Sequence, residues 1–289
     1  MHLSFIAFSI AAVFCIRLGI SLEAEPRSWS SRWQRALSFF LLPPLLLMTT
    51  ALAVLLMGTD GYMLGLPVGW IGYLWAIGFL GYAGLRLLGL MVGGWRSLQT
   101  VQTYDPFIFQ KTANFQKTAG YILDTPALFA AQVGFWNSKL VISRGLLTSC
   151  NDAQIEAVLT HEAAHHHYRD TFWFFWMGWL RQATSWLPYS NVLWQELLLL
   201  RELRADQWAA QKIDALLLAE TLLLVAKDCS SMPPEINCAA FSSAAPASRL
   251  EQRIEALLTE AEPFYQGQSI VFIWVFIAVL PLLTLLLHQ

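Results

Sequence analysis

The stretch Val158-Leu-Thr-His-Glu-Ala-Ala-His-His-His-Tyr-Arg-Asp170 decides how the rest of the chain is organised. It places His161 and His165 four residues apart, with Glu162 beside the first of them. Side chains four residues apart lie on one face of a helix, so both imidazoles can bind a single Zn²⁺ ion. The carboxylate of Glu162 then lies where a general base is needed to activate water at the metal. This pattern predicts a catalytic zinc helix.

A catalytic zinc site needs a third protein ligand and keeps one position open for water. We predict Glu202, in the segment Glu202-Leu-Arg-Ala-Asp206, as this ligand. The chain between His165 and Glu202 is long enough for one helix to leave the site and a second to return antiparallel. Asp206, one turn later, could accept the free ring N–H of a ligand histidine and fix its tautomer. The alternative is an exposed helix face on which both carboxylates pair with neighbouring arginines or with solvent.

The residues around the histidine pair allow more than one interpretation. A helix turns by about 100° per residue, so we expect His166 and His167 to point away from the metal face. Asp170 could brace a ligand histidine or cap the exposed end of the helix, and both interpretations stay open. Four side chains are candidates for stabilising the charge that develops on a substrate carbonyl oxygen: Tyr168, Tyr189, Arg204 and Arg249.

The composition is typical of a membrane protein. Of the 289 residues, 56% are hydrophobic and 13% are charged, whereas a soluble chain is about 25% charged. The 13 Trp and 18 Phe residues often lie near the edges of long apolar runs, as in the aromatic belts of membrane interfaces. A net charge of -2 argues against a nucleic-acid binder. The four cysteines form no Cys-x-x-Cys pair, which favours reduced thiols.

Four apolar segments predict membrane-spanning helices, because each approaches the length of about 20 residues that a bilayer requires. These segments are residues 3–20, 36–57, 70–95 and 269–287. No Lys or Arg occurs in 58–69 or after 269, whereas basic residues follow the first segment and recur through 96–268. By the positive-inside rule we expect a multi-pass protein of the cell membrane with both termini outside and the histidine pair in the cytoplasm.

The segment 96–268 contains signals for strands and helices. Residues 121–125 and a hairpin of 128–135 with 140–143 are predicted strands, and Asn151 with Gln154 resembles a capping box that starts the zinc helix. We expect a peptide substrate to pair with the strand 140–143. Further predicted helices cover 172–187, 190–212, 214–228 and 247–262, with a loop at 230–247.

Several of these segments, taken in order, resemble the integral-membrane zinc metallopeptidases of the BlaR/MecR type, which are gluzincins. The matching segments are residues 135–147, 161–170, 186–188, 202–206 and 253–258. The spelling Ala205-Asp206 is closer to the related HtpX and CAAX-protease family, where Glu-x-x-Ala-Asp is usual.

The resemblance implies a mainly α, integral-membrane fold with about four transmembrane helices and a cytoplasmic α+β gluzincin-like metalloprotease domain between spans three and four. The expected domains are a three-span region at 1–95, a cytoplasmic zinc metallopeptidase domain at 96–268 and a fourth transmembrane helix at 269–289. One Zn²⁺ per chain is expected on His161, His165 and Glu202, with Glu162 as catalytic base and Asp206 behind a ligand histidine.

The implied function is a zinc-dependent metalloendopeptidase that hydrolyses peptide bonds of a cytoplasmic or juxtamembrane protein. Its expected role is regulatory signalling, by cleavage of a repressor or of itself. One alternative is an HtpX-like protease of membrane protein quality control, and another is a non-catalytic membrane signal transducer. The expected partners are a protein or peptide substrate, with a transcriptional repressor as one candidate, and the lipid bilayer. A homodimer stays open, and no direct nucleic acid is expected.

Overall fold

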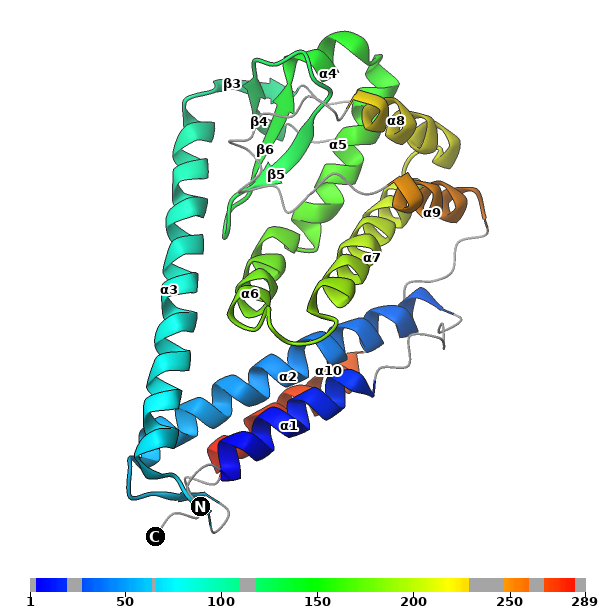
Figure 1. The fold of residues 1–289 in the computed structure, drawn as a ribbon. Coiled ribbons are helices and arrows are strands. Elements are labelled where there is room, and N and C mark those ends of the chain that lie inside the picture. The colour runs from blue at the N-terminus through cyan, green and yellow to red at the C-terminus, as the bar shows by residue number, and fades with distance from the viewer. Residues whose placement is uncertain are drawn as a thin grey trace. The chain divides into compact units, whose positions relative to one another are not determined.

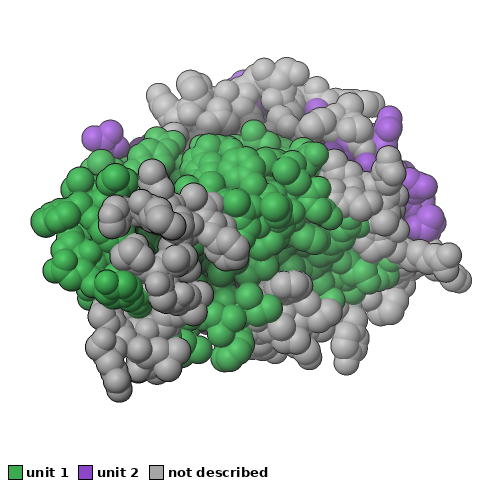
Figure 2. Space-filling model, turned by 60° about the horizontal axis from the view of Figure 1, so that its bottom comes forward, with its two compact units in different colours: residues 1–89, 177–197, 264–289 green, residues 90–176, 198–263 purple. Residues whose placement is uncertain are grey.

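The computed structural model describes residues 4–19, 28–63, 66–109, 118–228, 247–259 and 268–283. The chain divides into two compact units, which are coloured separately in Figure 2. Unit 1 comprises residues 1–89, 177–197 and 264–289, and unit 2 comprises residues 90–176 and 198–263. Residues 177–197 lie within the predicted domain 96–268, but they group with unit 1. The domain borders drawn from the sequence stay predictions. The loop predicted at 230–247 falls outside the described residues, apart from its last position.

Unit 1 is mainly helical. Helices α1 and α10 both pack along α2, and the three run side by side in Figure 1. A short antiparallel hairpin of β1 and β2 lies between α2 and α3 in the chain. The elements are α1 (Ser4–Leu18), α2 (Trp29–Met57), β1 (Tyr62–Met63), β2 (Leu66–Pro67), the first part of α3 (Gly69–Gln102) and α10 (Gln268–Leu283).

Two of the described helices, α2 and α3, are long and apolar enough to cross a membrane. Helix α2 begins before the predicted residue 36, and α3 continues past residue 95. The described parts of α1 and α10 have 15 and 16 residues, which is short of the roughly 20 that a span requires. Two apolar helices are weakly consistent with a membrane protein, and the four-span layout and the orientation of the termini stay predictions.

Side chains satisfy two backbone carbonyls inside the helix group of unit 1. Proline has no N–H, so Pro44 in α2 cannot donate to the carbonyl of Phe40 one turn earlier. The buried Arg17 of α1 donates its Nη2 to that carbonyl at 3.5 Å. Thr49 Oγ1 of α2 donates to the carbonyl of Ala278 in α10 at 2.5 Å. These two bonds connect α2 with its two neighbouring helices.

Unit 2 is built on a four-stranded mixed sheet with the strand order β3-β4-β6-β5 (Figure 1). The strands β4 and β6 pair in parallel, and the two outer pairs are antiparallel. The hairpin of β5 and β6 confirms the predicted hairpin, and β4 confirms the predicted first strand. No strand was predicted at the position of β3. The bounds are β3 (Asp105–Phe109), β4 (Thr118–Leu123), β5 (Ala130–Val133) and β6 (Lys139–Ser143).

The strand β6 lies inside the sheet, because β4 pairs with one of its edges and β5 with the other. After the exposed Lys139, its residues are buried on both faces: Val141 packs in one apolar cluster with Phe129, and Ile142 packs in another with Leu146. The prediction that the strand 140–143 offers a free edge to a peptide is therefore wrong. Among the described strands, β5 is the edge strand on this side of the sheet.

The remaining helices surround the sheet or continue from it. Helix α5 packs against β5 and α8, and α8 packs against α9. Helix α6 ends before the predicted residue 187, whereas α7, α8 and α9 confirm the three later helices within a few residues. Helices α6 and α7 each contribute residues to both units. The bounds are α4 (Arg144–Ser149), α5 (Asp152–His167), α6 (Asp170–Ala183), α7 (Ser190–Ala210), α8 (Ala215–Asp228) and α9 (Ala247–Leu258).

Candidate metal centre

Helix α5 presents the histidine pair, and local interactions fix where it begins. The side chain of Asn151 accepts the N–H of Gln154 at 2.9 Å, and the Gln154 side chain accepts the N–H of Asn151 at 3.0 Å. This reciprocal pair confirms the predicted capping box. Three turns later the helix carries His161, which is buried, and then His165, which is partly buried.

A tight turn connects α5 to α6 and places an acidic residue beside the site. Arg169 has a φ of 54°, a left-handed conformation that separates the end of α5 from the start of α6. Asp170, the first residue of α6, is buried and accepts a hydrogen bond from Nη2 of Arg204 on α7. The Arg204 guanidinium also lies 4.1 Å from the ring centroid of Tyr168. The turn thereby ties the ends of α5 and α6 to α7.

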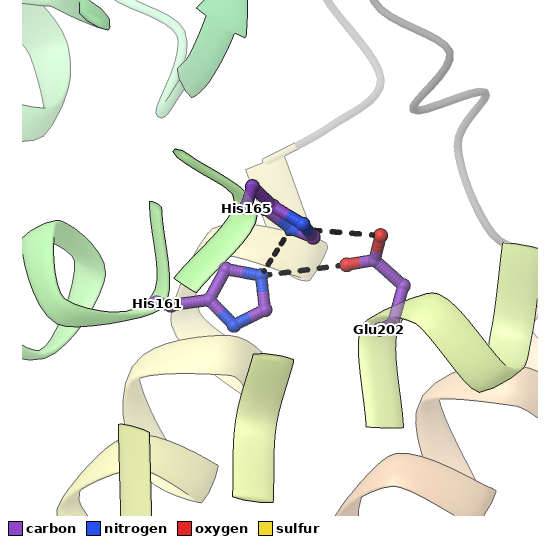
Figure 3. Close-up of side chains that lie close together, drawn as sticks. All are labelled: His161, His165 and Glu202. Carbon is purple, nitrogen blue, oxygen red and sulfur yellow. Dashed lines mark hydrogen bonds and ion pairs between the residues drawn. The ribbon is translucent and has the colours of Figure 1, made fainter. Parts of the chain in front are cut away.

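Glu202 of α7 meets the two histidines of α5, as Figure 3 shows. The Nε2 atoms of His161 and His165 are 3.1 Å apart. Oε2 of Glu202 lies 3.4 Å from Nε2 of His161, and Oε1 lies 3.7 Å from Nε2 of His165. The candidate ligand atoms all lie within 4.8 Å of one another. The fold thus brings together the three residues that the sequence suggested as ligands.

The other ring nitrogen of each histidine faces a buried carboxylate. Nδ1 of His165 lies 2.8 Å from Oδ2 of Asp170. Nδ1 of His161 lies 2.9 Å from Oδ1 of Asp206, although this pair is not aligned as a hydrogen bond. An ionised carboxylate can only accept, so these contacts favour the tautomer with the proton on Nδ1 and leave each Nε2 as a ligand. Of the two interpretations of Asp170, the structure favours the brace of a histidine over an exposed cap.

Arg253 on α9 holds the second of these carboxylates. It donates Nε and Nη2 to the two oxygens of Asp206 at 2.6 and 2.8 Å, and its Nη1 lies 3.5 Å from Oε2 of Glu202. A bidentate pair of this kind fixes the plane of the carboxylate. The sequence placed Arg253 in the segment 253–258, which resembles the metallopeptidase family, but offered no reason to connect it with Asp206. The pairing depends on how α9 packs, and no local pattern encodes it.

Arg201 holds Glu202 from the neighbouring position. Its Nε and Nη2 both donate to Oε1 of Glu202, at 2.9 and 2.7 Å. Its guanidinium lies 4.9 Å from the ring centroid of Phe174, and the side chain is buried. The sequence alternative, in which Glu202 pairs with an arginine, therefore coexists with the metal-ligand geometry. The pair lies in the interior and not on an exposed helix face.

The surrounding charges shift the protonation equilibria of the group. Burial alone lowers the pKa of His165, but the charge of Glu202 and the contacts with Asp170 and Glu202 outweigh burial and raise this pKa to about 10. The pKa of His161 is also raised, with burial opposed by the contact with Asp206. Burial raises the pKa of Glu202, but the charges of Arg201 and His165 hold it well below its usual value. A metal ion that binds here must therefore displace protons.

Glu162, the predicted base, is buried beside the histidines in sequence. Its Oε2 has no hydrogen-bond partner among the described residues. A buried carboxylate oxygen without a partner is costly, and such atoms call for a functional explanation. Nε2 of Gln132 on β5 donates to the backbone carbonyl of Glu162 at 3.4 Å, which links this turn of α5 to the edge strand.

The two following histidines contact other groups, as predicted. Nδ1 of His166 lies 3.0 Å from Oγ of Ser138 in the β5–β6 turn. The His167 ring stacks on Trp208 with 5.6 Å between centroids. Neither belongs to the metal-ligating group found among the described residues.

The chemistry of the donor set fits a zinc ion. Tetrahedral zinc with nitrogen and oxygen ligands at roughly 2.0–2.2 Å places neighbouring ligand atoms about 3.3 Å apart. The three distances of 3.1, 3.4 and 3.7 Å agree with that geometry. Two unprotonated Nε2 atoms at such a separation repel each other unless a cation or a proton lies between them. Two histidines and a glutamate are also a ligand set that catalytic zinc sites use.

Comparison with known families agrees with this geometry. Residues 107–227 match the family model of peptidase family M48. The matched range contains the helices α5 and α7 that carry the metal group, but it ends before Arg253. The match supports a metallopeptidase of this family, whose members are zinc enzymes. It does not distinguish the BlaR/MecR-type resemblance from the HtpX-type resemblance. A comparison with curated proteins found no match.

Proposed function

We propose that the chain is a zinc-dependent membrane metalloendopeptidase. One observation carries this proposal: Nε2 of His161, Nε2 of His165 and the carboxylate of Glu202 converge, while both Nδ1 atoms face buried carboxylates. A histidine pair with a purely structural role would not require three converging ligand atoms together with a buried carboxylate at each Nδ1. The M48 match over the same helices supports a peptidase chemistry for the group.

The residues of the chain divide the work of peptide hydrolysis among them. Zinc bound by the three ligands would supply Lewis acidity that polarises the scissile carbonyl and acidifies water. Glu162 takes a proton from the attacking water and passes it to the nitrogen of the leaving amine. Asp170 and Asp206 keep the imidazoles oriented. Arg201 holds Oε1 of Glu202, while Oε2 faces Nε2 of His161.

The edge strand β5 is our proposed binding site for the substrate backbone. β5 packs against α5, and no described strand pairs with its outer edge. An extended peptide can add to such an edge through main-chain hydrogen bonds, which gives sequence-tolerant recognition. Because strand hydrogen bonds alternate along a peptide, N-methylation at every second position of a substrate should abolish cleavage in one phase and spare it in the other. Equal cleavage of both peptides would exclude edge pairing.

We place the site on the cytoplasmic side of the cell membrane, with a cytoplasmic or juxtamembrane protein as the substrate. The leading role is a regulatory cut in a repressor or in the chain itself. Membrane protein quality control is the second candidate, because the Glu202-Leu-Arg-Ala-Asp206 spelling resembles that family. Protein termini that appear in cells with the wild type but not with Glu162→Gln distinguish the roles. A regulator produces one or a few such termini, and a quality-control protease produces many.

Metal analysis of purified variants tests the function. The wild type is expected to bind one zinc per chain. Glu162→Gln should retain zinc and lose proteolysis by a factor of about 10² to 10⁴, because it removes only the base. Glu202→Ala and His165→Ala should lose zinc affinity, whereas the adjacent His166→Ala serves as a matched control that keeps it.

Two outcomes of these measurements would change the proposal. A wild type without zinc under metal-replete conditions would contradict the enzyme. A wild type and a Glu162→Gln variant that both bind zinc, with neither cleaving any peptide, would favour the non-catalytic signal transducer.

A further inference from the structure

An aromatic surface in unit 2 lies at the tip of the β5–β6 hairpin and the first turns of α6. We call it the hairpin-tip surface. The ring of Phe135 packs edge-on against Phe175 with 4.6 Å between centroids, and Trp136 packs against Phe172 at 5.1 Å. These contacts fix the tip of the hairpin on α6. The members of the surface are Phe135, Trp136, Lys139, Arg169, Phe172 and Trp173.

The backbone conformation of the hairpin tip depends on a glycine. Gly134 has a φ of 128°, and a Cβ at this position would lie 3.2 Å from the carbonyl oxygen of Asn137. The turn therefore requires glycine. Ser138 in the same turn contacts His166, the residue after His165, at 3.0 Å. The surface thus adjoins the end of α5 that carries the candidate ligands.

Two tryptophans of this surface point outward. Trp136 is 69% exposed and Trp173 is 58% exposed. An indole combines a large apolar body with a polar N–H, which suits a position between an apolar phase and water. Tryptophan is accordingly enriched at the level of lipid headgroups. One such ring on the hairpin tip and another on the first turn of α6 indicate an interface.

The exposed charges of the surface are cationic. Lys139 and Arg169 are both exposed. In the stretches 130–139 and 166–176 the one acidic residue is Asp170, which is buried and bonded to His165 and Arg204. Lys and Arg near a membrane are attracted to anionic lipid headgroups. Outward indoles with cations and no exposed carboxylate in these stretches match the chemistry of an anionic bilayer interface.

We propose that the hairpin-tip surface docks on the interface of a bilayer that contains anionic phospholipids. Trp136 and Trp173 lie at the headgroup level, and Lys139 and Arg169 contact lipid phosphates. The proposal rests on the proposed membrane location of the chain but not on proteolysis. Docking holds the end of α5 at the membrane surface, which favours juxtamembrane segments as substrates.

Photo-crosslinking of the full chain in lipid nanodiscs tests this docking. A p-benzoylphenylalanine replaces Trp136 or Trp173 in a Glu162→Gln background, in discs of phosphatidylcholine with phosphatidylglycerol. Mass spectrometry after illumination should find phospholipid adducts at both positions. Ile108 of β3, which is 59% exposed outside the surface, is the matched control and should give none. Leu85 of α3, which is 70% exposed in a candidate span, should give adducts as the membrane control.

The two cations provide a second arm of the test. Each Lys or Arg near an anionic surface strengthens its attraction by about 1 kcal/mol, or roughly fivefold. The double variant Lys139→Gln and Arg169→Gln removes two such contributions, so it should lower the adduct yield at residue 136 by up to about 25-fold. The yield should fall to its level in discs of phosphatidylcholine alone. An unchanged yield would overturn the assignment to anionic lipid.

The remaining outcomes separate this proposal from the proposed function. Adducts at Leu85 without adducts at residues 136 and 173 would overturn the docking alone. Crosslinking of residue 136 to an added peptide in place of lipid would also overturn it and would assign the surface to the substrate. A lack of adducts at Leu85 would overturn the membrane location, and the docking with it. Zinc content and cleavage are measured separately, so their failure would leave these results intact.

Discussion

Arg253 in unit 2 and Arg17 in unit 1 are both buried arginines, yet their surroundings differ. Arg253 donates two bonds to Asp206, and its third nitrogen lies 3.5 Å from Glu202. Arg17 has one bond of 3.5 Å to the carbonyl of Phe40, and its Nε and Nη1 have no partner among the described residues. The first arginine belongs to a network of compensated charges, and the second meets a carbonyl that a proline has left unpaired.

The two arginines show that buried charge is compensated differently in the two units. A buried charge is costly unless opposite charges and hydrogen bonds compensate it. Unit 2 gathers three arginines and four carboxylates around two histidines, so removal of one member leaves another unpaired. In the described part of unit 1, Arg32 pairs with Glu196 at 2.8 Å where both side chains are partly exposed, whereas the buried Arg17 has no carboxylate partner. Substitutions in the two units should therefore have effects of different size and even of different sign.

We expect the largest change in stability from Arg253→Met. Removing the guanidinium leaves the buried Asp206 without its bidentate partner and leaves Glu202 with Arg201 alone, which should cost about 3–5 kcal/mol of stability. Chemical denaturation of the metal-free protein measures this loss. Arg253→Lys keeps the positive charge without the bidentate geometry and should lose less. Equal stability of Arg253→Met and the wild type would show that Asp206 does not depend on α9.

A second, smaller effect is expected from Asp170→Asn. The amide cannot compensate an imidazolium and no longer enforces the proton on Nδ1 of His165. Loss of such a partner typically lowers metal affinity about 10–100-fold. Competition with a zinc chelator measures the affinity, and the exposed Asp214→Asn is the control. An unchanged affinity would mean that Asp170 serves only the bond with Arg204.

The third-largest effect should be the pH dependence of stability in the metal-free protein. His165 has a pKa raised to about 10 in the metal-free chain, against an unfolded value of about 6.5. Its stabilising contribution is therefore fully present below about pH 6.5 and is lost as the pH rises toward 10. Unfolding of the metal-free protein across this pH range should show the decline in stability, and His165→Gln should make stability depend less on pH.

Zinc binding at pH 7 should release protons, which calorimetry in two buffers detects. Proton uptake on zinc binding would contradict the assignment.

The smallest effect is expected from Arg17→Met. A well-packed apolar side chain in place of a poorly paired buried charge is often neutral or stabilising. We expect a change in unfolding free energy within about 1 kcal/mol, or a gain, in contrast to Arg253→Met. Unfolding of both variants in the same detergent makes the comparison direct. A loss as large as that of Arg253→Met would show that Arg17 has a charged partner in the folded protein.

Much of the candidate site could be predicted because its signals are local. The spacing of His161 and His165 follows from the helical repeat, and the capping box of Asn151 and Gln154 acts within three residues. The turn at 136–139 likewise identified the β5–β6 hairpin. Each of these features depends on contacts between near neighbours, which the order of residues specifies directly.

Other features could not be predicted, because they depend on which segments meet. The strand β3 carries no alternating pattern, and the parallel pairing of β4 with β6 moved β6 from the expected sheet edge to its interior. The role of Asp170 depended on a left-handed turn at Arg169 that places it beside His165.

The sequence by itself determined a helix with a histidine pair and a base, a later helix with Glu202 and Asp206, and long apolar segments. Helical periodicity and hydrophobicity are properties of a segment, so they need no knowledge of its neighbours. Only the tertiary structure decided that Arg253 pairs with Asp206, that Arg201 engages Glu202, and that β5 is the edge strand beside α5. These pairings compensate buried charges between residues far apart in the sequence, so they depend on how the whole unit packs.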